Sequence, residues 1–312
     1  MYNTTRVENE VAIISLVSSA LSHLIPKIIP EIYGWGSASA PGSQGWILQE
    51  LMPGIPLSDE FGKMNLDEKS AVLGQIAGIF SALQNLKLPE SIKSFGGVTF
   101  DDEGLIVSAG MSSVEGGPWT TYEEFYLEQF KSALAQADTN RYIQGWCANG
   151  VRERLDAFVE NGLTASFRDL TSRDEKVIVH GDFTTNNMLF DIESRRITAL
   201  LDYDFACVSH PSQEFFRSMH DFGGQFQGWS GDEDSEQLVV QEAQLHGFPS
   251  PLPKSSEDGV DWEVLKAWED AMQKRQVKTP RIIDGVKKVA DVDALLQAVL
   301  PFHVTNPDKL KL

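Results

Sequence analysis

The chain has 312 residues, of which 42% are hydrophobic and 23% are charged, so it can bury a full core within one or two domains. Its formal net charge of −19 excludes a broad surface for nucleic acid or for an anionic membrane, because both need clustered Lys and Arg. A cationic substrate is compatible with this charge. Two cysteines without a CxxC motif indicate neither a disulfide framework nor a zinc site, and a cytoplasmic location is expected.

The amino-terminal part of the chain predicts one helix and two extended segments. Residues 8–22 have the pattern of an amphipathic helix, and their acidic start argues against a signal peptide. Proline residues break this helix and lead into an extended segment over residues 31–35. Residues 46–52 predict a strand, which the turn dipeptide Pro53-Gly54 closes. No stretch of the sequence is long and apolar enough to span a bilayer.

The remainder of the chain predicts mainly helices. Asn65 can cap a helix that runs to about residue 88 and has one apolar face. Residues 97–108 predict a β-hairpin that turns at residues 102–104. Further helices are expected over residues 120–137, 151–161, 262–272 and 286–300.

A second β-hairpin is predicted near the middle of the chain. Two apolar runs, residues 188–191 and 197–201, flank a polar segment. A turn centred on residues 194–195 would set Leu189 opposite Leu200. The residues that flank the two strands would then meet at the open end of the hairpin.

The residues with the clearest chemical meaning flank this hairpin. His180, Asp182 and Asn187 form the pattern His-x-Asp-x4-Asn, and Asp202 follows the second strand. Asn187 and Asp202 would offer an amide oxygen and a carboxylate, the hard-oxygen ligands that Mg²⁺ requires. Asp182 lies in the loop at the same end, where it can accept or orient a substrate hydroxyl.

Each of these assignments has a structural alternative. Asn and Asp often only satisfy turn backbone, but three polar groups that converge at one hairpin end are costly without a ligand. For His180, a hydrogen-bonded brace of the loop is favoured over a proton shuttle. A second metal role for Asp204 stays open. The tripeptide Asp221-Phe222-Gly223 spells a kinase metal motif, but it lies about twice as far from Asp182 as Asp202 does, so we assign Asp221 to a helix end or a loop.

The chain resembles the aminoglycoside phosphotransferase and choline kinase-like superfamily, in its fungal-type branch. Members carry an HGDxxxxN loop, an IDW or DFD metal segment, an LxExxxG hinge and an HPxxEF stretch. Here these correspond to residues 180–187, 201–204, 48–54 and 210–215, and the likeness runs from about residue 8 to residue 224.

The resemblance implies an α+β, protein-kinase-like fold in two parts. Residues 1–52 would form a truncated small β lobe with one helix and the hinge. Residues 53–312 would form a larger, mainly α-helical lobe that carries the catalytic hairpin. Asp182 would be the catalytic base, with His180 beside it, and Asn187 and Asp202 would hold Mg²⁺.

The resemblance also implies how ATP is held. The Gln49 carbonyl and the Leu51 N–H would contact the adenine. Glu10 would pair with the phosphate-binding lysine, although an exposed helix acid favoured by the dipole is an equal alternative. Members place a nucleotide-covering hairpin and a lysine-bearing strand before this helix, whereas nine residues precede Glu10 here and the first lysine, Lys27, follows the helix. Without this lysine, we expect that the α- and β-phosphate charge is left to Mg²⁺ alone. Either the reading frame starts late, or the protein is a weak or inactive kinase relative.

Two functions are compatible with these observations. The first is an ATP- and Mg²⁺-dependent phosphotransferase that acts on a hydroxyl of a small polar molecule. The second is a catalytically weak or inactive kinase-like binding protein that has lost the phosphate clamp. The retained Asp182, Asn187 and Asp202 favour the first, and the missing strands favour the second. The sequence indicates neither the substrate nor an oligomeric state.

Overall fold

The computed structural model describes residues 4–24, 26–39, 42–112, 114, 116–143, 147, 149–228, 235–255, 259–301 and 304. Its α-helices are α1 (Arg6–Ala20), α2 (Ser58–Phe61), α3 (Leu66–Gln84), α4 (Tyr122–Thr139), α5 (Val151–Ala157), α6 (Leu163–Ser166), α7 (Ser212–Arg217), α8 (Glu236–His246), α9 (Trp262–Lys274) and α10 (Val286–Val299). Its strands are β1 (Ile32–Gly36), β2 (Trp46–Gln49), β3 (Ile55–Pro56), β4 (Gly97–Phe100), β5 (Ile106–Ala109), β6 (Val177–Val179), β7 (Met188–Asp191), β8 (Arg196–Leu200) and β9 (Cys207–Ser209).

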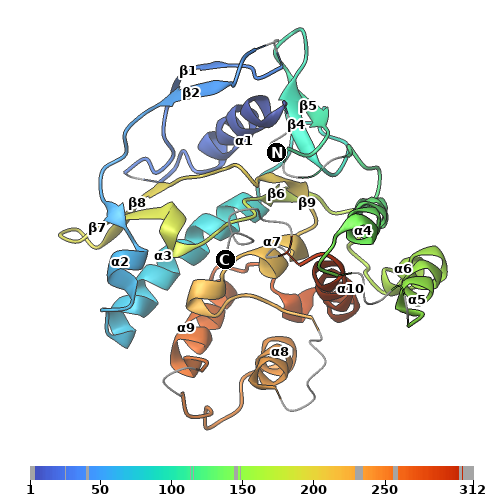
Figure 1. Ribbon diagram of the computed structural model, residues 1–312. Coiled ribbons are helices and arrows are strands. Elements are labelled where there is room, and N and C mark those ends of the chain that lie inside the picture. Colours follow the sequence, from blue (N-terminus) through green and yellow to red (C-terminus); the bar gives the residue numbers. More distant parts are fainter. Residues whose placement is uncertain are drawn as a thin grey trace.

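The strands form small antiparallel sheets, and the helices lie mainly on one side of them. Figure 1 shows β1 and β2 as a ribbon beside α1 at one end of the molecule, and α3, α8, α9 and α10 toward the other. The hairpin β7–β8 and the pair β6–β9 lie between these two regions. The predicted α+β fold is confirmed. Among the described residues, no helix combines the length and apolar character needed to cross a membrane.

Helix α1 is held on strand β4 by a buried polar side chain. Residues Val11, Ile13 and Val17 of α1 are almost fully buried, as expected for the apolar face of an amphipathic helix. Asn9 is 1% exposed, and its Oδ1 accepts a hydrogen bond of 2.9 Å from the Val98 N–H of β4. Because a buried amide needs partners, this contact fixes the helix along its axis.

The predicted hairpin over residues 188–201 is confirmed, but its expected register is wrong by one residue. Leu189 lies opposite Ala199, not Leu200, and the register shifts between Leu189 and Phe190. The extra residue in β8 is Thr198, whose hydroxyl donates a hydrogen bond to the Pro53 carbonyl. This irregularity, a β-bulge, cannot be derived from the alternation of apolar residues, because it depends on packing against the 53–54 turn.

The pair β6–β9 positions the loop that leads into the hairpin. Val177, Ile178 and Val179 are buried and pair with Ser209, Val208 and Cys207. Helix α3 packs against β6 and β8. Its capping box is present as the sequence suggests, with the Glu68 N–H donating to Asn65 Oδ1 at 3.0 Å.

Several predicted boundaries were too generous. The strand predicted over residues 46–52 ends at Gln49, and the helix predicted to residue 88 ends at Gln84. The helix predicted over residues 151–161 changes to a π-helical turn at Phe158. Helices α2, α6, α7 and α8 were not predicted. Short helices such as α2 and α7 hold few turns, so their periodicity is weak.

Candidate active site

The loop between β6 and β7 brings Asp182 and Asn187 into direct contact. The amide group Nδ2 of Asn187 donates to Asp182 Oδ2 at 2.8 Å and to the Asp182 carbonyl at 2.9 Å. At the open end of the hairpin the Leu201 N–H donates to the Asn187 carbonyl at 2.9 Å. Asn187 therefore faces Leu201, and Asp202 comes one residue later.

His180 joins the two sides of this site. It is fully buried. Its Nδ1 lies 3.3 Å from the Asp182 N–H, which donates to it, and its Nε2 lies 3.0 Å from the Leu201 carbonyl. These contacts require the tautomer with the proton on Nε2. Burial lowers the pKa of His180 to about 4, so the ring is neutral at neutral pH and its geometry favours the bracing role over a proton shuttle.

The lowered pKa of His180 predicts an acid-sensitive fold. Its pKa is about 4 in the folded protein and about 6.5 in an unfolded chain, so between these values the unfolded state binds the extra proton and stability falls as pH falls. We expect the His180→Gln variant to lose about 2 kcal/mol less stability than the wild type between pH 7 and pH 5 in urea titrations. The exposed-site variant His23→Gln should keep the wild-type profile; identical slopes in all three proteins would contradict the assignment.

The buried carboxylate of Glu214, which the sequence analysis missed, binds the backbone of the same loop. Glu214, in α7, is 1% exposed. Its two oxygens accept from the His180 N–H at 2.5 Å and the Gly181 N–H at 3.0 Å, and from the Ser218 hydroxyl at 2.5 Å. Burial raises the pKa of Glu214, and these three donors oppose that rise. The stretch 210–215 was recognised as a motif, but nothing in the sequence says which backbone groups it reaches.

Glu214→Gln is expected to loosen the loop. A glutamine keeps one acceptor oxygen but places an NH₂ group against a backbone donor, so one buried N–H loses its partner at a cost of about 1–3 kcal/mol in unfolding free energy. The His180 and Gly181 amide protons should also exchange faster, because Glu214 holds both N–H groups. Urea denaturation and amide hydrogen exchange, with the exposed Glu90→Gln as control, measure both effects. Wild-type stability together with wild-type exchange would argue against the positioning role.

Asp221 lies in a short 3-10 helix, His220–Phe222, as expected for a helix end or a loop. Its Oδ2 accepts hydrogen bonds from the Thr185 N–H at 2.5 Å and from the Thr185 hydroxyl. The carboxylate thus ties the loop to the segment after α7. These hydrogen bonds give the Asp221 carboxylate a structural role that needs no metal ion.

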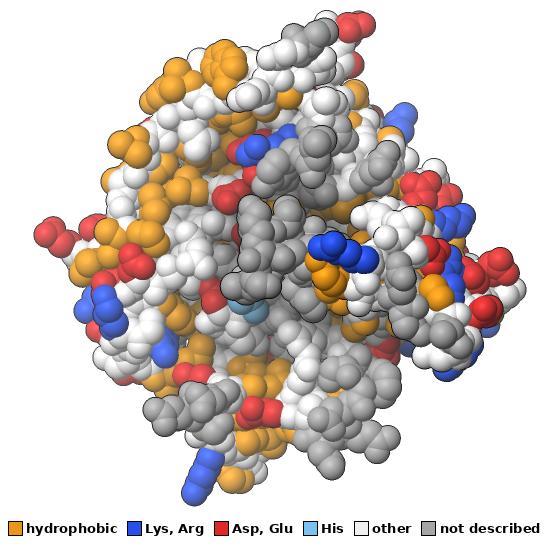
Figure 2. Space-filling view, in the orientation of Figure 1, with side chains coloured by type: hydrophobic (Ala, Val, Ile, Leu, Met, Phe, Trp, Pro, Cys, Tyr) orange, Lys and Arg blue, Asp and Glu red, His pale blue; other side chains and the backbone are white. Residues whose placement is uncertain are grey.

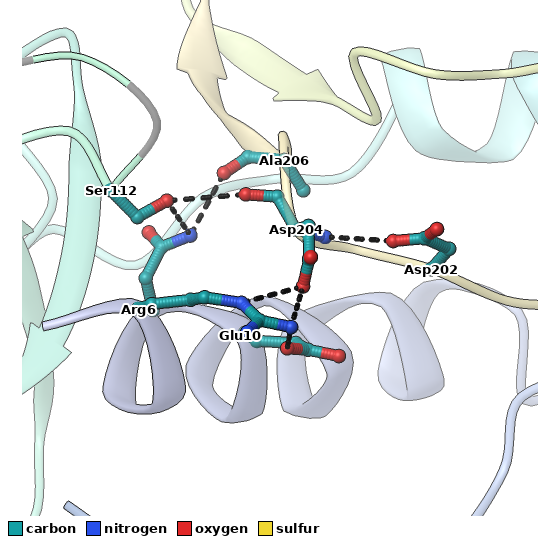
Figure 3. Close-up of polar contacts among 7 residues, drawn as sticks. Arg6, Glu10, Ser112, Asp202, Asp204 and Ala206 are labelled. Atoms are coloured by element: carbon teal, nitrogen blue, oxygen red, sulfur yellow. Dashed lines mark hydrogen bonds and ion pairs between the residues drawn. The ribbon is translucent and has the colours of Figure 1, made fainter. Parts of the chain in front are cut away.

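The segment after the hairpin gathers acidic side chains around one arginine, as Figure 3 shows. Asp202 has a positive φ of 62°, a conformation that Asp and Asn tolerate better than other side chains. Arg6 of α1 binds Asp204 Oδ1 through Nη2 at 2.6 Å and through Nε at 2.9 Å. Glu10 Oε2 lies 3.9 Å from Arg6 Nη2.

The electrostatics of this segment follow from crowded carboxylates. Burial raises the pKa of Asp202, and Asp204 and Asp182 raise it further. Burial also raises the pKa of Glu10 to about 7, with Asp204 as the next cause, while Arg6 opposes the rise. Negative charge therefore exceeds what Arg6 balances, so an added cation would be stabilised here.

The backbone of the acidic segment is fixed from two sides. Asn9 Nδ2 donates to the Ala206 carbonyl at 2.9 Å. The Ser112 hydroxyl donates to the Asp204 carbonyl at 3.3 Å (Figure 3). Asn9 Nδ2 also lies 3.3 Å from Ser112 Oγ. Helix α1 thus sets the position of the acids as well as supplying Arg6.

The pairing of Glu10 with a phosphate-binding lysine stays a prediction, and in the described part of the chain the ion pair of Glu10 is with an arginine. Its cationic neighbour is Arg6, one helical turn earlier. Lys27 instead pairs with Glu50 at 3.2 Å and with Glu31 at 3.8 Å.

A cavity of about 630 Å³ lies between α1 and the β1–β2 ribbon. Its lining includes Arg6 and Glu10 from α1 and Gln49 from β2, so two of the three residues predicted to hold ATP share one cavity. Leu51, the third, follows the end of β2 and is 95% exposed. The described residues that line the cavity include none of Asp182, Asn187 and Asp202. Arg6 lines it and binds Asp204, which lies two residues after Asp202.

The walls of this cavity are partly aromatic. Trp46 lines it and covers Gly36, where an added Cβ would lie 2.3 Å from Trp46 Nε1. Figure 2 shows hydrophobic side chains gathered over the β1–β2 region, among which Trp46 and Leu48 are more than half exposed. A flat ring system can pack against such a surface.

The fold is similar to that of solved phosphotransferases. The gentamicin complex of APH(2'')-IIa superposes with a TM-score of 0.50 at 16% identity, covering 96% of this chain and 73% of that one. The streptomycin–ATP complex of APH(2'')-IIa gives 0.46 at 15% identity over 87% and 71%. An ethanolamine kinase from Plasmodium vivax gives 0.41 at 12% identity over 94% and 76%. The first of these supports the fold.

The sequence itself shows the family. The chain belongs to the phosphotransferase enzyme family, which it matches over residues 2–268. This range contains α1, the hinge segment and the whole of the loop and hairpin described above. No curated protein matches the sequence.

Proposed function

We propose that the protein is an ATP- and Mg²⁺-dependent phosphotransferase that transfers the γ-phosphoryl group to a hydroxyl of a small polar molecule. The observation that carries this proposal is the contact of Asn187 Nδ2 with Asp182 Oδ2 at 2.8 Å, at the open end of the hairpin that leads into Asp202. Family membership supports the reaction class. Asp182, Asn187 and Asp202 are the proposed functional set.

Asp182 is proposed to bind the acceptor hydroxyl and take its proton. Asn187 holds one carboxylate oxygen through Nδ2, which sets the orientation of the carboxylate. The Asp182 N–H is anchored on His180, so the loop cannot swing away without breaking a buried contact. A fixed carboxylate aligns a hydroxyl for in-line attack, and positioning is the main source of catalysis in phosphoryl transfer.

Asn187 and Asp202 are proposed to hold Mg²⁺. The residues present fit the ion: Asn187 commits its nitrogen to Asp182, which leaves the amide oxygen as its ligand atom. The pKa of Asp202 is raised by burial and then by Asp204 and Asp182, whose negative charge a cation would offset. When bound, the ion would neutralise charge on the phosphates. The Gln49 carbonyl and the Leu51 N–H are proposed to hold adenine at the end of β2.

Binding and transfer are tested separately. Isothermal titration with MgATP measures binding, and incubation with γ-labelled ATP and a panel of hydroxyl compounds, including gentamicin, streptomycin and ethanolamine, measures transfer. Saturable binding and label in one acceptor support the proposal. Binding without transfer to any acceptor would favour the alternative, a binding protein of the same fold. No binding at millimolar MgATP would refute the assignment.

A further inference from the structure

We infer that Arg6 is the cationic group that holds the nucleotide phosphates in this protein. The inference rests on the proposed function, because it concerns how the same site binds ATP. It is an alternative to the expectation that Mg²⁺ alone meets the phosphate charge. The evidence is the position of Arg6, its partners and the composition of the cavity that it lines.

Arg6 links the cavity to the proposed metal site. It lines the cavity of about 630 Å³ together with Gln49, and its guanidinium binds Asp204, which stands two residues after Asp202. A nucleotide with its base at Gln49 and its metal at Asp202 must place its phosphates between these residues. Arg6 occupies that interval, and 37% of its side chain is exposed.

The charge of the cavity points to the same residue. Among the described residues that line it, Arg6 is the one cationic side chain. Lys27 is engaged with Glu50 and Glu31 and does not line the cavity. A triphosphate that binds here therefore has Arg6 as its protein counter-charge within the described lining, and the position of Arg6 in the first turn of the fifteen-residue helix α1 adds the positive end of the helix dipole.

The guanidinium is already oriented for this task. Its Nε and Nη2 both bind Asp204 Oδ1, at 2.9 and 2.6 Å, and Glu10 lies 3.9 Å from Nη2 on the helix. Arginine carries five N–H donors in a planar fork, so one guanidinium can bind a carboxylate and a phosphate oxygen together. The pair of acids prevents the side chain from searching many rotamers, which lowers the entropy cost of binding a phosphate.

A purely structural role for Arg6 is the competing explanation, since the Arg6–Asp204 pair also ties α1 to the acidic segment. The two roles differ in what they do to ligands without phosphate. If Arg6 binds phosphate, its removal weakens the binding of ATP and ADP but leaves the affinity for adenosine unchanged. If Arg6 only holds α1 in place, its removal weakens the binding of all three ligands to the same extent and lowers the melting temperature.

The test compares Arg6→Met, Arg6→Lys and the control Lys27→Met by isothermal titration with MgATP, ADP and adenosine. We expect Arg6→Met to weaken MgATP and ADP by about tenfold to a hundredfold and to leave adenosine within about twofold. Arg6→Lys should give an intermediate loss, because it restores the charge without the fork. Lys27→Met should bind all three like the wild type.

Two results would overturn the inference while the proposed function stands. One is wild-type affinity of Arg6→Met for MgATP. The other is an equal loss of adenosine and MgATP affinity in both Arg6 variants. If the wild type itself binds no MgATP, the proposed function fails, and this inference fails with it. Melting curves of each variant show whether the fold is retained, and Arg6→Lys keeps the comparison valid if Arg6→Met does not fold.

Discussion

An Asp182→Asn variant is expected to lose about three orders of magnitude in kcat for MgATP turnover while it still binds MgATP. The proposed carboxylate base accepts the acceptor proton, and an amide cannot. The asparagine retains an oxygen that can accept from Asn187 Nδ2, whose contact at 2.8 Å holds the wild-type side chain. Loop geometry should therefore survive, and the loss should fall on the chemical step.

The matched control for this variant is Asp191→Asn. Asp191 is the last residue of β7, and its carboxylate accepts a hydrogen bond of 3.1 Å from the Ser194 N–H in the hairpin turn. Asp191→Asn therefore makes the same chemical change at the far end of the same hairpin. We expect its kcat to stay within about threefold of the wild type. If Asp182→Asn kept a tenth or more of the wild-type kcat, Asp182 could not be the base.

The second large effect is expected for Asp202→Asn. Removal of the carboxylate that is proposed to bind Mg²⁺ should lower kcat by about a hundredfold or more and shift the Mg²⁺ dependence to higher concentrations. Asparagine is the right replacement, because residue 202 has a φ of 62°, which alanine tolerates poorly. Turnover measured across a Mg²⁺ titration separates weaker metal binding from a general loss of activity.

The same variant makes an opposite prediction for the protein without ligand. Burial raises the pKa of Asp202, and the charges of Asp204 and Asp182 raise it further, so part of the destabilisation in the wild-type site is repulsion between like charges. Asp202→Asn removes one of these charges, and its melting temperature without Mg²⁺ should equal or exceed that of the wild type. A variant that lost activity only because it unfolds would melt earlier. Asp221→Asn is the useful contrast, since it should lower stability and leave the Mg²⁺ dependence unchanged.

Local sequence pattern was sufficient for the hairpin and for placing Asp182 and Asn187 at the same end of it, but it did not predict their direct contact. Apolar runs on both sides of a polar turn predict strand pairing, and five residues of separation keep the two side chains in one loop. The register was wrong because the turn comes one residue earlier than expected: Asp191 pairs with Arg196, which centres the turn on residues 193–194. The bulge at Thr198, whose hydroxyl contacts Pro53 145 positions away, then shifts the pairing again by one residue. Such long-range packing is invisible to periodicity.

Glu214 and Arg6 were missed for the same reason, because their contacts join distant parts of the chain. Glu214 reaches the His180 and Gly181 N–H groups from α7, across 34 and 33 positions. Arg6 meets Asp204 across 198 positions, and it was overlooked because the expected cation was a lysine on a strand. Neither contact leaves a spacing pattern in the chain. The roles of Gln49, Leu51 and Glu10, and the boundary between residues 52 and 53, stay predictions.

A structure of the protein with ADP and Mn²⁺, with the metal located by its anomalous scattering, tests the proposed site most directly. The account predicts a metal peak bound at about 2 Å to the side-chain oxygen of Asn187 and to the Asp202 carboxylate, beside Asp182. A metal held by Asp221, or by Glu10 and Asp204 with neither Asn187 nor Asp202 in contact, would contradict it.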